Sequence, residues 1–133
     1  MKILIAEDDM IGRKLLVKFL ERFGECNVAV DGIEALEKFI GSYEDKSPYD
    51  LMCLDIMMPK LDGLKVLKAA RDYEKKNSID KGNQTKIIMT TALNDKKTVD
   101  QSYELGCDGY AWKPIDLDKF EEVLNKLKLI NKE

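Results

Sequence analysis

The sequence predicts an α/β fold in which a mainly parallel sheet of five strands carries helices on both faces. Short aliphatic runs alternate five times with longer segments of helical periodicity, as expected of consecutive strand–helix units. The run Asp50–Asp55 is apolar throughout between its two acids and does not alternate, which indicates a strand covered on both faces. The chain has 133 residues, 44% of them apolar, and no internal repeat or linker-like segment. We therefore expect a single domain over residues 1–133.

The first two strand–helix units follow from hydrophobic periodicity. Lys2–Ala6 is a short aliphatic run that predicts the first strand. Apolar side chains then recur every four residues and predict one face of a helix: Ile11, Leu15, Phe19 and Phe23, widened by Leu16 and Leu20. Cys26–Val30 predicts the second strand, and Asp31 with Glu34 three residues later resembles a helix-capping pair. The apolar face of that second helix is formed by Ile33, Leu36, Phe39 and Ile40.

The middle of the chain contains the third helix and the fourth strand. Pro59 interrupts the loop after the buried strand, and a helix is expected from Gly63 to Lys75. The polar segment 77–86 then reads as an exposed connector. Ile87–Thr91 predicts the fourth strand.

The last units are marked by capping residues. Asn94 or Asp95 can cap a helix that Gly106 ends. Gly109–Trp112 predicts the fifth strand, and Asp116 can cap the final helix. The apolar face of that helix consists of Leu117, Phe120, Leu124 and Leu127.

The composition excludes several classes of function. The 22 basic and 25 acidic residues give a net charge of −3, spread along the chain, so there is no broad basic surface for DNA or RNA. The apolar runs are far shorter than the ~20 residues of a membrane helix. The N-terminus turns acidic too early for a secretory signal, and three widely spaced cysteines suit a reducing cytosol. The chain has no histidine, which excludes Ser-His-Asp and Cys-His nucleophiles and a phosphohistidine of its own.

Polar residues follow four of the predicted strands. The acids 7–9 follow the first strand, and Asp55 ends the third. Thr91 ends the fourth strand and Lys113 follows the fifth. Ligands of open α/β sheets bind where the strands end. If strands one, three, four and five are neighbours, these side chains therefore lie on one rim.

Such a rim suits phosphoryl chemistry that is assisted by a divalent cation. An acidic loop repels a bare phosphate, but carboxylates and a carbonyl can bind Mg²⁺, which then attracts phosphoryl oxygens. Asp55 could attack phosphorus to form an aspartyl-phosphate, with Thr91 donating a hydrogen bond and Lys113 a positive charge. Each group could equally have an ordinary role, because such acids often only cap helices and most lysines are solvated. The functional interpretation depends on all four meeting at one rim.

Together, four segments resemble the receiver domains of two-component response regulators. The resemblance covers essentially the whole chain and is specific in its joint pattern. It rests on Ile5-Ala6-Glu7-Asp8-Asp9, Leu54-Asp55-Ile56-Met57-Met58-Pro59 with Asp62-Gly63, Met89-Thr90-Thr91-Ala92, and Gly106-Cys107-Asp108-Gly109-Tyr110-Ala111-Trp112-Lys113-Pro114.

The resemblance implies a flavodoxin-like sheet of order 2-1-3-4-5 and a role for each matching residue. Asp55 is the expected phosphoacceptor. The expected Mg²⁺ ligands are Asp8, Asp55 and the backbone carbonyl of Met57, with Glu7 acting through water. Thr91 is the expected switch hydroxyl, Tyr110 the switch aromatic and Lys113 the phosphate-contacting cation. The bond between Lys113 and Pro114 is expected to be cis.

The resemblance also implies partners. A sensor histidine kinase or a histidine phosphotransfer protein would supply the phosphoryl group. The face built from the fourth helix, fifth strand and fifth helix would then control a downstream protein. No direct nucleic-acid contact, no membrane insertion, a cytoplasmic location and a stand-alone receiver are expected. Trp112 lies on the same side of its strand as Tyr110, either as a partner anchor or as core packing.

Two positions tune the lifetime of the phosphorylated state in this family, and here they are Met57 and Leu93. We expect these apolar side chains to shield the acyl phosphate and slow its hydrolysis.

Three competing functions are less consistent with the sequence. An Asp-nucleophile phosphohydrolase would need an acid where Met57 stands, so we expect no enzyme beyond the domain's own phosphorylation and dephosphorylation. A flavodoxin-like flavin binder is opposed by the acidic first loop, which would repel the flavin phosphate. A degenerate receiver that never accepts phosphate is opposed by the complete set of acids, threonine and lysine.

Overall fold

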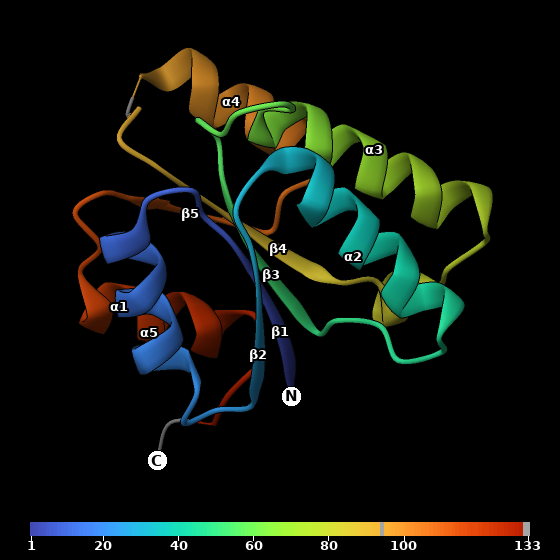
Figure 1. Ribbon diagram of the computed structural model, residues 1–133, viewed down its shortest axis with the longest axis horizontal. Helices are drawn as coiled ribbons and strands as arrows, with labels where there is room; N and C mark the ends of the chain where they lie inside the picture. Colours follow the sequence, from blue (N-terminus) through green and yellow to red (C-terminus); the bar gives the residue numbers. More distant parts are fainter. Residues whose placement is uncertain (94, 132–133) are drawn as a thin grey trace.

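The computed structural model describes residues 1–93 and 95–131, in which helices lie on both sides of one parallel sheet (Figure 1). The strands of this part are β1 Lys2–Ala6, β2 Glu25–Ala29, β3 Leu51–Asp55, β4 Lys86–Thr91 and β5 Gly109–Trp112. They pair in parallel in the order β2-β1-β3-β4-β5. The predicted fold class and strand order are therefore confirmed. The second strand begins and ends one residue earlier than predicted.

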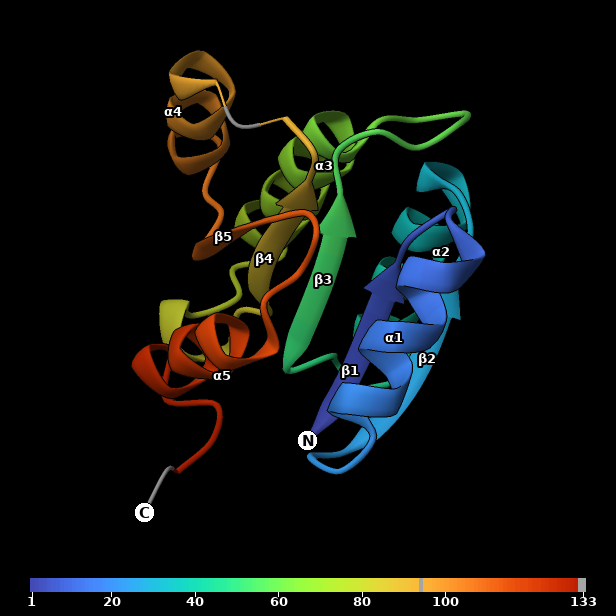
Figure 2. The same ribbon diagram turned by 90° about the vertical axis from the view of Figure 1, so that its left-hand side faces the viewer.

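The helices fall into two layers. They are α1 Met10–Leu20, α2 Gly32–Glu44, α3 Gly63–Lys76, α4 Lys96–Glu104 and α5 Leu117–Lys126. Helices α1 and α5 cover one face of the sheet, and α2, α3 and α4 cover the other (Figures 1 and 2). A short 3₁₀ turn, η1 (Lys81–Asn83), lies in the predicted connector. Among the described residues, no helix is both long and apolar enough to cross a bilayer.

Alternate side chains of β3 enter the two hydrophobic cores. Leu51 and Cys53 face the core beneath α1 and α5, and Met52 and Leu54 face the core beneath α2 and α3. All five residues of this strand are buried, so the predicted coverage of both faces is confirmed. A strand in this central position holds its last residue, Asp55, firmly at the edge where the strands end.

Each of the five helices begins after an aspartate whose side chain accepts a backbone N–H of the first turn. These caps are Asp9, Asp31, Asp62, Asp95 and Asp116. Such caps satisfy amide groups that have no partner inside the helix. The predicted caps Asp31, Asp95 and Asp116 are confirmed, and the other candidate cap, Asn94, lies outside the described residues. Because every helix follows a strand, all five caps lie near the carboxyl edge of the sheet.

The predicted core face of α1 was right in part, because Leu16, Leu20, Phe19 and Phe23 pack on the core beneath α1 and α5 but Ile11 and Leu15 do not. Ile11 is 78% exposed and Leu15 is also exposed, whereas Leu16 and Leu20 are buried. Both sets recur at a spacing of four residues, and periodicity alone does not say which stripe faces the sheet. The cap at Asp9 and the docking of α1 on β1 select the stripe of Leu16 and Leu20. The prediction for α5 was right, since Phe120 and Leu124 are its buried residues.

Candidate metal and phosphoryl site

Two neighbouring strands bring the acids together. Ala6 of β1 pairs with Leu54 of β3, so the next residues, Glu7 and Asp55, emerge side by side. Both are buried, and Asp8 in the following loop is exposed. One carboxylate oxygen from each of the three acids lies within 4.8 Å of the others. The predicted gathering of these acids is thus present in the structure.

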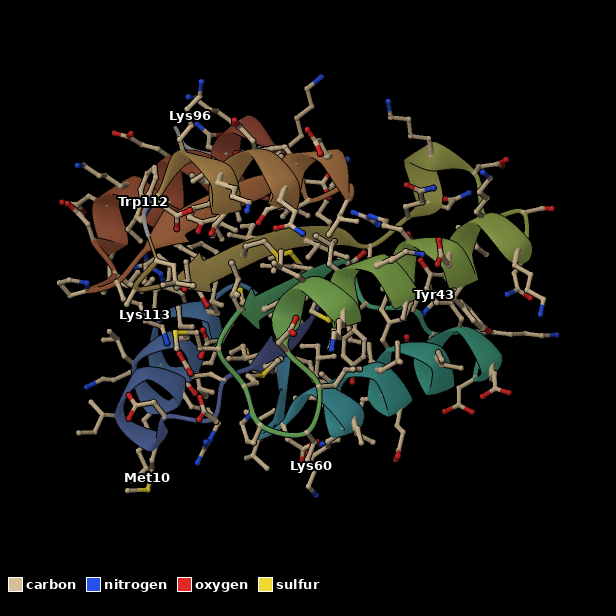
Figure 3. All side chains as sticks on the ribbon, turned by 90° about the horizontal axis from the view of Figure 1, so that it is seen from above. Met10, Tyr43, Lys60, Lys96, Trp112 and Lys113 are labelled. Carbon is tan, nitrogen blue, oxygen red and sulfur yellow. The ribbon has the colours of Figure 1, made fainter. Side chains whose placement is uncertain are left out.

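Lys113 enters the same site from the end of β5. Its Nζ forms an ion pair with Glu7 Oε1 and lies 3.3 Å from Asp55 Oδ2. The backbone N–H of Lys113 donates to the carbonyl of Thr91 at 2.8 Å, which joins the ends of β4 and β5. The Lys113–Pro114 bond is cis, as expected. Figure 3 shows Lys113 at the same end of the molecule as Met10, which follows the acidic loop, with Tyr43 at the opposite end.

The three buried or half-buried charges shift each other's pKa. Burial, a hydrogen bond with Glu7 and the charge of Glu7 raise the pKa of Asp55 to about 7, against the opposing effect of Lys113. Burial also opposes ionisation of Glu7, but hydrogen bonds with Asp55 and Lys113 outweigh it and lower the pKa of Glu7. Burial likewise opposes the charge on Lys113, yet its contacts with Glu7 and Asp55 raise its pKa. The positive charge of one lysine therefore offsets only part of the negative charge of the two buried acids.

This donor set fits a hard divalent cation. Three carboxylates offer oxygen ligands only, and Asp8 leaves one side of the group open to water. Mg²⁺ prefers oxygen ligands and retains several waters. A cation here would also supply the positive charge that Lys113 alone does not provide for Glu7 and Asp55. The backbone N–H of Met57 donates to Asp55 Oδ1 at 3.2 Å, so the loop that carries the expected carbonyl ligand is held next to the phosphoacceptor candidate.

Thr91 and Tyr110 are linked through the backbone of Leu93. The hydroxyl oxygen of Thr91 accepts the N–H of Leu93 at 3.1 Å. The hydroxyl of Tyr110 donates to the carbonyl of Leu93 at 2.7 Å. The predicted switch hydroxyl and switch aromatic therefore bind the two ends of one residue. Sequence reasoning gave Leu93 only a shielding role and did not anticipate this connection.

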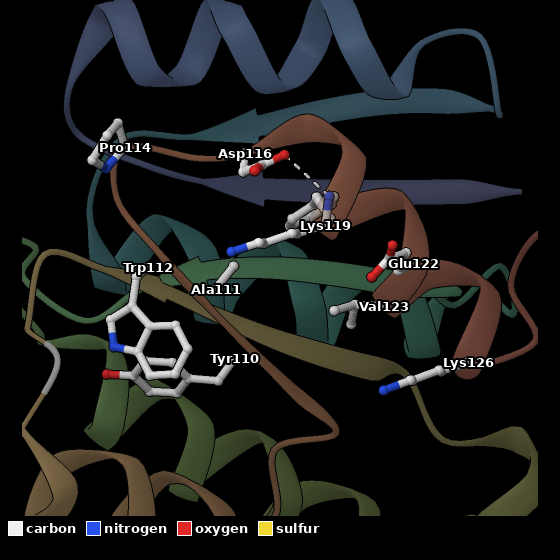
Figure 4. A pocket seen from close by; sticks show the side chains of 10 residues that line it. Tyr110, Ala111, Trp112, Pro114, Asp116, Lys119, Glu122, Val123 and Lys126 are labelled. Atoms are coloured by element: carbon white, nitrogen blue, oxygen red, sulfur yellow. Dashed lines mark hydrogen bonds between the residues drawn. The ribbon is translucent and has the colours of Figure 1, made fainter.

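Trp112 lies on an open surface beside Tyr110. The two ring centroids are 5.2 Å apart, which agrees with their expected placement on one side of β5. Trp112 is 49% exposed, so the interpretation of this residue as core packing was wrong. Next to it, a groove of about 360 Å³ runs between β5 and α5 (Figure 4). Its lining includes Tyr110, Trp112, Lys119, Glu122 and Lys126.

The first turn of α1 contains site residues that the sequence analysis missed. Arg13 Nη1 donates to the carbonyls of Glu7, at 3.0 Å, and Asp8, at 3.3 Å. At Gly12 a Cβ atom would stand 3.2 Å from Glu7 Oε1, so glycine leaves room for this carboxylate. A usable signal was present. A cation in the first turn of a helix opposes the helix dipole and needs a compensating partner.

Several known proteins are similar to this chain in sequence. A family model described as the response regulator receiver domain matches residues 3–125. The chain is 30% identical over 131 residues to the chemotaxis protein CheY of Treponema pallidum, covering 96% of this chain and 83% of that protein. It is 34% identical over 126 residues to hybrid signal transduction histidine kinase L of Dictyostelium discoideum. That match covers 94% of this chain but only 7% of the kinase, so the chain spans a small part of such relatives.

A solved structure of a CheY protein is also similar to this chain in fold. The crystal structure of the CheX-CheY-BeF3-Mg+2 complex from Borrelia burgdorferi matches with a TM-score of 0.82 and 27% identity. The match covers 96% of this chain and 89% of that one. The family model matches residues 3–125, and the acids, the threonine and the lysine lie at one edge of the sheet. The chain therefore belongs to the response regulator receiver domains of two-component signalling.

Proposed function

We propose that this receiver domain is a switch activated by phosphorylation of Asp55. The observation that carries the proposal is the placement of Asp55, buried between Glu7 and Lys113 and within 4.8 Å of Asp8. A phosphohistidine of a sensor histidine kinase or of a histidine phosphotransfer protein is the proposed donor. The chain has no histidine, so the donor must be another molecule.

Each residue of the site has a separate role in the proposed phosphoryl transfer. An Asp55 carboxylate oxygen attacks phosphorus, the new O–P bond forms, and the N–P bond to the donor imidazole breaks. Lys113 lies 3.3 Å from Asp55 Oδ2 and can pair with a phosphoryl oxygen. We assign Thr91 as a hydrogen-bond donor to the phosphoryl group. Positioning and charge stabilisation suffice for such a reaction, so a large catalytic apparatus is unnecessary.

Mg²⁺ is the proposed cofactor. Asp8, Asp55 and the backbone carbonyl of Met57 would hold it, with Glu7 acting through water. When bound, it neutralises phosphoryl charge that the acids would otherwise repel. The chain's own contribution is to keep these oxygens together at the strand ends and to hold Asp55 through the N–H of Met57.

We propose that Leu93 transmits the effect of phosphorylation from Thr91 to Tyr110. A phosphoryl group adds about −1.5 to −2 of charge and three strong acceptors beside Thr91. If the Thr91 hydroxyl turns to that group, it releases the N–H of Leu93, and the Tyr110 hydroxyl bound to the same residue must adjust. We propose that the α4-β5-α5 face, with Trp112 and its groove, reports this change to a downstream protein.

The domain extent, the location and the absence of turnover that the sequence predicts are also part of this proposal. Residues 1–133 are proposed to form one receiver domain that acts in the cytoplasm without contacting nucleic acid directly. We propose no enzymatic turnover beyond the domain's own phosphorylation and dephosphorylation, because Met57 stands where a phosphohydrolase needs a second acid.

Beryllofluoride, a mimic of the phosphoryl group, tests the proposal. Titration with Mg²⁺ and beryllofluoride should shift amide NMR signals first near Asp55 and then as far as Tyr110 and Trp112. Asp55→Asn should abolish the response to the mimic while the protein stays folded. A response that persists in this variant would mean that the acceptor is misassigned. Absence of an aspartyl-phosphate mass adduct after incubation with a competent donor would contradict the proposed transfer.

A further inference from the structure

We propose that Arg13 is a positioning residue for the metal site. Its guanidinium fixes the backbone of Glu7 and Asp8, so that the two carboxylates are presented in one arrangement. This inference rests on the magnesium site proposed above and concerns a residue that touches neither the metal nor the phosphoryl group.

The contacts of Arg13 are specific to the acidic loop. A single nitrogen, Nη1, donates to the carbonyl of Glu7 at 3.0 Å and to that of Asp8 at 3.3 Å. These are the backbone groups of two of the three acids that lie within 4.8 Å of one another. Asp8 is exposed, so its position depends more on the loop backbone than on side-chain packing.

The location of Arg13 in α1 makes a purely helical role unfavourable. Arg13 is the fourth residue of a helix that begins at Met10, where the helix dipole disfavours a positive charge. The first turn of α1 carries no acidic residue, and the carboxylate of the capping Asp9 accepts the backbone N–H of Gly12. The partners of the guanidinium are instead the two carbonyls of the loop, so its favourable interactions are made with the metal site.

The N-cap Asp9 and the first-turn residue Gly12 constrain the same loop. The backbone N–H of Asp9 donates to Glu7 Oε2 at 3.2 Å. Gly12 leaves the space next to Glu7 Oε1 free, because a Cβ there would come within 3.2 Å. Arg13 thus completes a turn that constrains the Glu7 side chain and the backbone of both acids.

Loss of Arg13 would have two opposite effects, and they can be separated. Removal of a nearby positive charge should tighten the binding of any divalent cation by a similar factor. Removal of the positioning contacts should weaken Mg²⁺ binding more than Ca²⁺ binding, because Mg²⁺ demands near-octahedral geometry and Ca²⁺ accepts flexible sites. The ratio of the two dissociation constants therefore reports positioning.

The test compares Arg13→Met with Lys14→Met, which removes a positive charge one residue away. Kd values for Mg²⁺ and for Ca²⁺ are measured separately from amide NMR shifts of the intact chain. We expect Arg13→Met to weaken Mg²⁺ binding by about tenfold, as for other residues that orient metal ligands, and Ca²⁺ binding much less. Lys14→Met should leave the ratio of the two Kd values unchanged. Arg13→Lys keeps the positive charge and the helix propensity. It should also weaken Mg²⁺ binding relative to Ca²⁺ binding, so the test remains possible if Arg13→Met folds poorly.

Two results would overturn the inference. In one, the Arg13 variants bind Mg²⁺ as tightly as the wild type; in the other, they change both Kd values by the same factor. A wild-type chain that shows no saturable Mg²⁺ binding would overturn the proposed metal site as well. That outcome is distinct from a failure of Arg13 alone.

Discussion

At the residue scale, the raised pKa of Asp55 should make stability depend on pH in the absence of metal. Its pKa is raised to about 7 from the ordinary value of 3.8, so the fold favours the protonated form. The contribution of Asp55 to stability should therefore fall as pH rises from about 4 to about 7 and level off above that. Asp55→Asn cannot ionise and should be more stable than the wild type by about 2 kcal/mol at pH 8 but nearly equal at pH 4.

Urea unfolding in the presence of EDTA, at pH 4 and pH 8, measures this difference. Asp100→Asn is the matched control, since Asp100 is exposed and lies outside the site. A constant difference between Asp55→Asn and the wild type across this range would show that Asp55 is not the titrating group.

Met57 and Leu93 should set the lifetime of the phosphorylated state. They are 60% and 37% exposed, so they are free to cover the rim rather than to fill the core. Apolar side chains at a reactive centre limit the access of water. Met57→Asn and Leu93→Glu should each lose labelled phosphate several times faster than the wild type. Unchanged decay in both variants would remove the shielding role.

The sequence could predict which groups meet at the site, because strand ends meet at one edge of a parallel sheet. It could not predict how those groups are held. A cation in the first turn of α1 indicates that Arg13 has a partner, but the identity of its two carbonyl acceptors depends on loop geometry, as does the link of Thr91 and Tyr110 through Leu93. Side-chain chemistry is visible in a sequence, whereas backbone acceptors are the same at every residue.

At the scale of elements, a buried ion network ties α3 to the strand ends opposite the site. Arg71 binds Glu74 of its own helix and Asp108 before β5, with Nη2 of Arg71 2.7 Å from Asp108 Oδ2. Tyr43 of α2 and the N–H of Thr85 also bind Glu74, which is fully buried. Such a charge is tolerated only while its partners remain.

Arg71→Met should therefore lower the free energy of unfolding by about 3–5 kcal/mol, because it leaves buried Glu74 without its cation. The double variant Arg71→Met/Glu74→Gln should lose less than the sum of the two single changes. Lys68→Met breaks an exposed pair with Asp72 and should cost less than about 1 kcal/mol. Urea unfolding of these variants and of Glu74→Gln checks this, and a loss in Arg71→Met no larger than in Lys68→Met would contradict it.

Element boundaries were predictable where a capping residue marks them. Asp31, Asp95 and Asp116 identified three helix starts, and Gly106, with φ of 104°, identified the end of α4. The buried face of α1 was predictable only in part, because the stripe of Ile11 and Leu15 has the same spacing as that of Leu16 and Leu20. Only the docking of the helix on the sheet chooses between them.

At the scale of the whole molecule, the phosphoryl site and the α4-β5-α5 face should respond together to the phosphoryl mimic. Trp112 is the single tryptophan of the chain, and its ring lies 5.2 Å from that of Tyr110. Mg²⁺ with beryllofluoride should therefore produce a saturable change in tryptophan emission, and the midpoint should match that of the NMR shifts near Asp55. Thr91→Ala should still bind the mimic but lose the emission change, since the contact with Leu93 is gone. An undiminished emission change in that variant would exclude the Thr91–Leu93–Tyr110 connection.

The five aspartate caps give the molecule an electrical polarity. Together with Glu7, Asp8 and Asp55, they gather eight carboxylates near one end of a chain whose net charge is only −3. Lys60 and Lys113 pair with three of these acids. We expect the others to present a negative pole to approaching macromolecules at the end where phosphoryl transfer is proposed to occur. A donor with a cationic rim would be steered toward that pole before any contact forms, and dissolved salt would weaken this guidance. The same residues that start the helices thus bias the direction from which a partner arrives.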